Sequence, residues 1–192
     1  MLVNTCKSKP VPGITPHVLC SIAKGMLPFY QTVAASEPFA GQWSRAVVRA
    51  DLSAMRKLLD AVDPALGKEG LGTNGIGYFI TFGFPKTDVY YTNGITIPPG
   101  TVRFTFQTGI HRRIAKAVIP FYKELICNWP YAQALAKAIR RKDRKAAAYM
   151  VRSLINTKAL RSVELDRSGL ALTFKYRSTQ WVYRNLLNPE PF

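Results

Sequence analysis

An internal repeat constrains the fold of this chain more than any other feature. The segment IAKGMLPFY, beginning at Ile22, returns as IAKAVIPFY at Ile114, 92 residues later. Kept without gaps, this spacing gives 18 identities over the 72 positions that align residues 22–93 with 114–185, where chance would give about four or five. The sequence therefore predicts a tandem duplication of a unit of about 92 residues.

Each copy is expected to begin with a helix, over residues 17–35 and 110–127, because apolar residues recur there at helical spacing. Pro28 and Pro120 fall inside these helices at the same position of the repeat. An internal proline removes a backbone hydrogen bond, so we expect a kink or a break in both.

Second helices are predicted over 38–49 and 130–141, each starting at a proline that the first turn tolerates. Asp51 and Asp143 are then candidate N-caps of third helices. Alternatively, the second and third helices are continuous and the aspartates are merely exposed.

Strands are predicted after the helices, where aromatic and β-branched residues gather. They cover residues 78–84 and 170–176, with return strands at 89–91 and 181–183. A further strand is expected at 102–107, where apolar and polar residues alternate. The predicted unit is thus a short strand or arm, three helices and a hairpin, and the fold class is α+β.

Three segments follow from this division: an extended, proline-rich arm at 1–16, a first repeat at 17–100 and a second repeat at 101–192. No Gly/Ser-rich linker separates the repeats. We therefore expect them to share one core as a pseudo-twofold dimer within the chain.

Charge distinguishes the two copies. The chain has a formal net charge of +16, of which residues 22–93 contribute +1 and residues 114–185 contribute +11. The cations are densest in the segment 137–145, which predicts a polyanion-binding surface made of Lys137, Arg140, Arg141, Lys142, Arg144 and Lys145. If the segment is one helix, four of these cations share one side of it: Lys137, Arg141, Arg144 and Lys145. A solvated face and an interface with an acidic partner are the alternatives.

Little in the sequence indicates catalysis. The two histidines, His17 and His111, lie near helix starts and are expected to be surface or capping residues, and Cys127 is expected to be a packed thiol. Asp51 and Asp143 could form a paired acidic site across the pseudo-twofold axis, although N-capping with a local ion pair is the simpler account. The glycines of 70–77 precede a strand and lack a following G-K-[ST], which argues against a phosphate-binding loop. We predict no catalytic residue, metal site or cofactor.

The cysteines Cys6, Cys20 and Cys127 are odd in number and far apart, which favours free thiols and a cytoplasmic location. No apolar run approaches the length of a membrane span, and residues 1–16 lack the features of a secretory signal.

These observations favour a non-enzymatic, self-associating structural protein whose second repeat presents a basic surface to a polyanion or an acidic partner. The arm, the strand at 102–107 and the tail at 188–192 are candidate contacts between subunits. The alternative is a nucleic-acid-binding protein that contacts the phosphate backbone without sequence preference, and a small enzyme is the third hypothesis.

Overall fold

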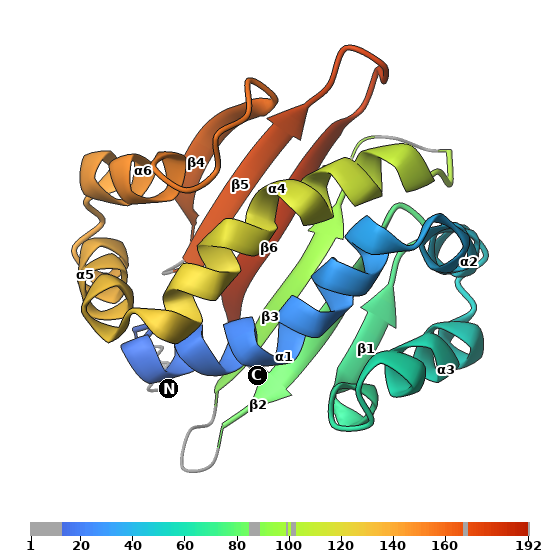
Figure 1. Ribbon diagram of the computed structural model, residues 1–192, viewed down its shortest axis with the longest axis horizontal. Coiled ribbons are helices and arrows are strands. Elements are labelled where there is room, and N and C mark those ends of the chain that lie inside the picture. The colour runs from blue at the N-terminus through green and yellow to red at the C-terminus, as the bar shows by residue number, and fades with distance from the viewer. Residues whose placement is uncertain (1–12, 85–88, 99, 101–102, 167–168, 192) are drawn as a thin grey trace, which may run out of the picture.

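The fold is α+β, as the sequence predicts. The computed structural model describes residues 13–84, 89–98, 100, 103–166 and 169–191. Within these ranges, six α-helices accompany one six-stranded antiparallel sheet (Figure 1). The first half holds α1 (Pro16–Ala35), α2 (Glu37–Val48), α3 (Leu52–Val62), a short 3-10 helix η1 (Leu66–Lys68), β1 (Gly70–Thr73), β2 (Gly77–Gly83) and β3 (Val89–Thr96). The second half holds α4 (Thr108–Cys127), α5 (Trp129–Arg140), α6 (Arg144–Arg152), β4 (Leu160–Asp166), β5 (Gly169–Lys175) and β6 (Val182–Pro191).

The two halves meet at the middle of the sheet. Its strand order is β1-β2-β3-β6-β5-β4, so that β3 and β6 form the central pair, with Gly94 opposite Leu186. Above this pair, α1 and α4 lie side by side across one face of the sheet (Figure 1). The buried apolar cluster accordingly includes side chains from both halves.

The first helix of each half is unbroken. Both α1 and α4 continue through their internal prolines, Pro28 and Pro120, so the break that the sequence allowed is absent. In α1, Thr32 Oγ1 donates to the Pro28 carbonyl at 2.9 Å, one turn earlier in the same helix.

A tight turn separates the second helix from the third in both halves, so the continuous-helix alternative is wrong. Ala50 and Lys142 adopt the left-handed conformation, with φ of 53° and 55°. In each turn, the following aspartate N–H donates to a carbonyl five residues back, which closes the Schellman motif that commonly ends a helix. Asp51 and Asp143 then cap the third helices, accepting from Ala54 N–H and Ala146 N–H at 2.9 and 3.0 Å, as predicted.

Because Ala50 carries a Cβ in a conformation that favours glycine, we expect Ala50→Gly to raise the free energy of unfolding by about 1 kcal/mol. Urea denaturation measures the change. Ala54→Gly, at a helical position of α3, is the matched control and should lower the same quantity by about 1 kcal/mol. Equal effects of the two substitutions would contradict the role of the turn.

Each half ends in three antiparallel strands instead of the predicted hairpin. The main strands, β2 and β5, are confirmed within one residue at each end, whereas β1 and β4 were not predicted. Residues 103–107 form no strand, so this part of the strand predicted at 102–107 is wrong. Phe106 is buried in the core, and Gln107 N–H donates to Tyr183 Oη at 3.1 Å. This segment therefore leads directly into α4.

The predicted tail is part of the sheet. Residues 188–191 extend β6 and pair with β3. A role of this segment in contacts between subunits stays a prediction. Residue 192 and residues 1–12 of the predicted arm lie outside the described residues. Of the remaining arm, Ile14 is fully buried and Pro16 already belongs to α1.

Four buried polar side chains form a closed hydrogen-bonded ring where the halves meet. Tyr30 Oη donates to Asn93 Oδ1 (2.7 Å), Asn93 Nδ2 to Tyr122 Oη (2.6 Å), Tyr122 Oη to Asn185 Oδ1 (3.4 Å) and Asn185 Nδ2 to Tyr30 Oη (2.8 Å). Burial raises the pKa of Tyr122 to about 12 and raises that of Tyr30 as well, so both phenols stay neutral. We call this set the central polar ring.

Candidate functional site

The predicted cations lie at one corner of the molecule, where α5 turns into α6. This basic corner consists of Lys137, Arg140, Arg141, Lys142, Arg144 and Lys145. The Schellman turn at Lys142 divides it between two helices, so the prediction that four cations share one side of a single helix is wrong. The turn nevertheless keeps all six within one short stretch of surface.

The cations of the basic corner differ in what they contact. Arg140 Nη1 donates to the Ile14 carbonyl at 2.9 Å and its methylenes lie against Gly13, so this side chain fixes the segment before α1. All six residues are exposed, Arg140 included.

Helix electrostatics favour some of these cations and oppose others. Lys137 is in the last turn of α5 and Arg141 caps it, where the helix dipole favours positive charge. Arg144 and Lys145 begin α6, where the dipole favours acids instead. Their positions therefore do not serve the stability of α6.

Acidic groups do little to neutralise the basic corner. The ion pairs found in the described part of the chain, Arg112–Glu37 at 2.8 Å and Arg184–Glu164 at 2.9 Å, both lie elsewhere. Asp143 is the one acid of the segment, and its Oδ1 accepts from the Ala146 N–H. The corner thus keeps an excess of positive charge that can attract an anion.

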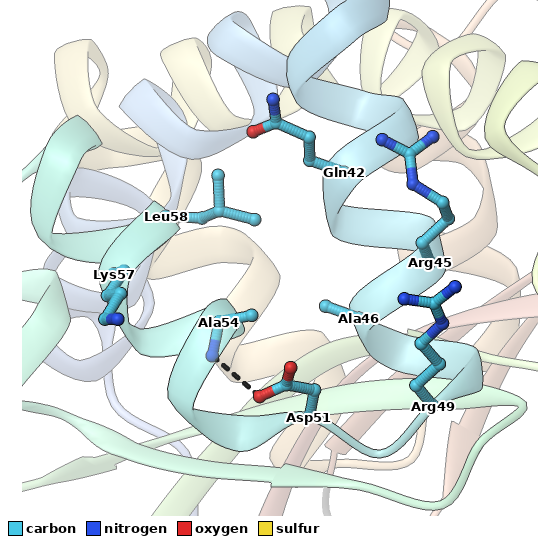
Figure 2. Close-up of a pocket in the computed structure, with 8 residues that line it drawn as sticks. All are labelled: Gln42, Arg45, Ala46, Arg49, Asp51, Ala54, Lys57 and Leu58. Atoms are coloured by element: carbon cyan, nitrogen blue, oxygen red, sulfur yellow. Dashed lines mark hydrogen bonds between the residues drawn. The ribbon is translucent and has the colours of Figure 1, made fainter.

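The corresponding corner of the first half, between α2 and α3, forms an open, shallow cavity of about 320 Å³. Figure 2 shows Arg45 and Arg49 along one side of α2, with Lys57 across the cavity on α3. The two arginines precede Lys137 and Arg141 by the repeat spacing, whereas the positions of Arg144 and Lys145 are taken by Leu52 and Ser53. The first corner therefore shares two cations with the second and lacks the rest.

Several other cations of the second half are engaged within the chain. Arg152 donates to two backbone carbonyls of β4, Lys175 Nζ to the Thr179 carbonyl at 2.8 Å, and Arg113 lies over the Tyr176 ring at 5.7 Å. Of the aromatic residues near them, Tyr183 is fully buried and Trp181 packs against the core, in agreement with a structural role. Arg167 lies outside the described residues.

The candidates for chemistry are dispersed. α3 packs on β1 and α6 on β4, which are the opposite edges of the sheet, so Asp51 and Asp143 do not form the paired acidic site that was considered. Cys127 is exposed at the end of α4 and is not the packed thiol expected, while Cys20 is buried and donates to the Leu125 carbonyl. Both are free thiols.

His111 is fully buried, which corrects the surface position expected for it, whereas His17 is exposed. The Nε2 atom of His111 lies 3.1 Å from Tyr78 Oη, and the Nδ1 atom of His111 has no hydrogen-bond partner. Loss of solvation in this site lowers the pKa of His111 to about 3, so the ring is neutral near pH 7.

Sequence reasoning also missed the central polar ring. A signal was present, because both its tyrosines and both its asparagines match at the repeat spacing.

Comparison with protein-family models, with curated proteins and with solved structures yields no match for this chain. In the described residues, no helix is both long enough and apolar enough to span a membrane.

Proposed function

We propose that this chain is a non-enzymatic, self-associating protein whose basic corner contacts the phosphate backbone of a nucleic acid. Backbone contacts are electrostatic and independent of sequence. They require exposed lysines and arginines whose charge is not neutralised within the protein, and five side chains of the basic corner meet this requirement.

The observation that carries the proposal is the placement of Arg144 and Lys145 in the first turn of α6. Positive charge there opposes the helix dipole, and no described acid forms an ion pair with either side chain. The corresponding first-half residues, Leu52 and Ser53, are uncharged. The third helix of the first half therefore forms without cations at these positions. Binding of an external anion would explain why the third helix of the second half has two of them.

We also propose that the two halves arose by duplication and form a pseudo-twofold dimer, with segments 17–100 and 101–192 as the two copies. The pairing of β3 with β6 supports this: Asn93 lies opposite Leu187 and Ile95 opposite Asn185, a register symmetrical about the Gly94–Leu186 pair at the repeat spacing. The left-handed residues Ala50 and Lys142 are likewise 92 positions apart.

A matched pair of variants tests the function of the basic corner. Lys137→Glu/Arg141→Glu and Arg45→Glu/Arg49→Glu change the net charge equally, at corresponding positions of the two halves. Binding of a fluorescent single-stranded oligonucleotide of mixed sequence is measured by anisotropy between about 50 and 200 mM salt.

We expect the second-half variant to lower affinity by at least about 10-fold and the slope of log K against log salt by about 1.5. The first-half variant should leave both within about a factor of two of the wild-type values. Each variant places two acids in the last turn and at the C-cap of a helix, so both should lose a similar amount of stability, about 1–2 kcal/mol. Equal losses of affinity in the two variants, or a wild-type chain that does not bind the oligonucleotide, would refute the proposal.

A further inference from the structure

One face of the sheet is not covered by any helix of the described residues. Tyr78, Asn93 and Asn185 point toward α1 and α4, since they contact side chains of those helices. Side chains alternate along a strand, so their neighbours in sequence point to the other side. Figure 1 shows α1 and α4 in front of the strands and none of the described helices behind them. We call the other side the open face.

The centre of the open face carries small and apolar side chains. Direct pairing across the strands places Gly72, Phe79, Gly94, Leu186 and Ala171 in one row from β1 to β5. Phe79 and Leu186 are half-buried, and each has a glycine or alanine on both sides. Large side chains next to glycine and alanine make the surface uneven, which allows the side chains of two packed sheets to interdigitate.

Charge also distinguishes the open face from the rest of this strongly basic chain. Its described charged side chains are Lys175, Arg184 and Glu164, which lie away from the row through Phe79 or at its end. Arg184 forms an ion pair with Glu164 at 2.9 Å, and Lys175 Nζ donates to the Thr179 carbonyl. A second copy, itself at +16, would meet less repulsion here than at the basic corner.

The size of the open face suits a dimer. Six strands spaced about 4.8 Å apart and about 20 Å long give a face of roughly 600 Å² in projection. Standard interfaces bury about 800 Å² of accessible surface per partner, so this face would give an interface at the small end of the range.

We propose that the open face packs against the open face of a second copy, so that two sheets form the inner layers of a two-fold symmetric dimer. The inference rests on the self-association proposed above and names its surface. The basic corners lie at the edge of the sheet, where α6 packs on β4, and stay accessible in this dimer.

Sedimentation velocity over a range of protein concentrations tests this interface. We expect the wild-type chain to dimerise and Leu186→Glu to raise the dimer dissociation constant by roughly 100-fold or more, because the change enters the interface twice. Leu186→Thr, which keeps a residue that favours strands, should raise it by about 10-fold. Leu52→Glu makes the same kind of change at an exposed apolar position on α3 and should dimerise like the wild type.

Two results would overturn the open-face interface. The first is a wild-type chain that stays monomeric at every concentration, even if it dimerises once residues 1–12 are removed. The second is an unchanged dimer in Leu186→Glu, which would leave self-association standing through another surface. The proposed role of the basic corner is judged separately, from the salt dependence of binding.

Discussion

Replacing Asn93 with leucine is expected to lower the free energy of unfolding by about 4 kcal/mol. Asn93 accepts from Tyr30 Oη and donates to Tyr122 Oη and to the Leu186 carbonyl. Leucine is similar in size and offers no donor or acceptor, so these three buried groups lose a partner. Each unsatisfied buried group costs about 1–3 kcal/mol, and the remaining ring bonds offset part of the sum. Urea denaturation followed by circular dichroism measures the loss.

Two companion variants sharpen this prediction. Asn185 occupies the corresponding place in the central polar ring and donates to Tyr30 Oη and the Gly94 carbonyl, so Asn185→Leu should cost a similar amount. Asn188 lies on β6, as Asn185 does, but on the open face, and its Oδ1 has no hydrogen-bond partner. Asn188→Leu is therefore expected to change stability by less than about 1 kcal/mol. A loss as large at Asn188 as at Asn93 would show that the ring has no special role.

Stability is also expected to fall in mild acid because of His111. Its pKa is about 3 in the folded chain and about 6.5 when unfolded. The unfolded state therefore takes up a proton below pH 6.5 that the folded state refuses. The stabilisation is fully present above pH 6.5, and about 2 kcal/mol is lost by pH 5 and about 3 kcal/mol by pH 4. The physical cause is loss of solvation, because a protonated ring would be a charge in a fully buried site.

The measurement is the free energy of unfolding in urea at pH 7, 6 and 5, for the wild type and for His111→Leu. The variant should be less stable at pH 7 by about 1–2 kcal/mol, because Tyr78 Oη loses its partner. Its stability should then change little down to pH 5. Burial raises the pKa of Glu69, so the contribution of this group to stability increases as the pH falls, opposite to that of His111. A variant that keeps the wild-type acid sensitivity would exclude His111 as its source.

Local signals predicted the helices well. Thr15, Ser36, Asp51, Asn128 and Asp143 each accept a hydrogen bond from the first turn of a helix, and such residues mark helix starts in sequence. The separation of the second helix from the third was left open, because Ala50 and Lys142 are unusual residues for a left-handed helix end.

The sheet was harder to predict. In β1, the glycines of Gly70–Thr73 resemble a loop, and only pairing with β2 holds them extended. The end of β6 resembles a tail because it contains Pro189, which cannot donate to a neighbouring strand. Pro189 is tolerated because β6 extends there beyond its pairing with β5 and pairs with β3 alone.

The candidate site was predicted in composition and only partly in role. The exposure of the basic corner agrees with the expectation, since lysine and arginine side chains are rarely buried unless they are paired. The contact of Arg140 with Ile14 joins residues 126 positions apart, and the burial of His111 depends on Phe29, Tyr78 and Phe106 packing around it. Such contacts are set by tertiary structure, which local patterns do not encode.

The order of strands in the sheet has a consequence for synthesis on the ribosome. β3 emerges well before β6, its neighbour at the middle of the sheet, has been translated. If the first half folds before β6 is made, β3 forms a strand edge with unpaired amide and carbonyl groups, which is the kind of edge that recruits foreign strands. Folding of the sheet only after β6 has been translated avoids this edge.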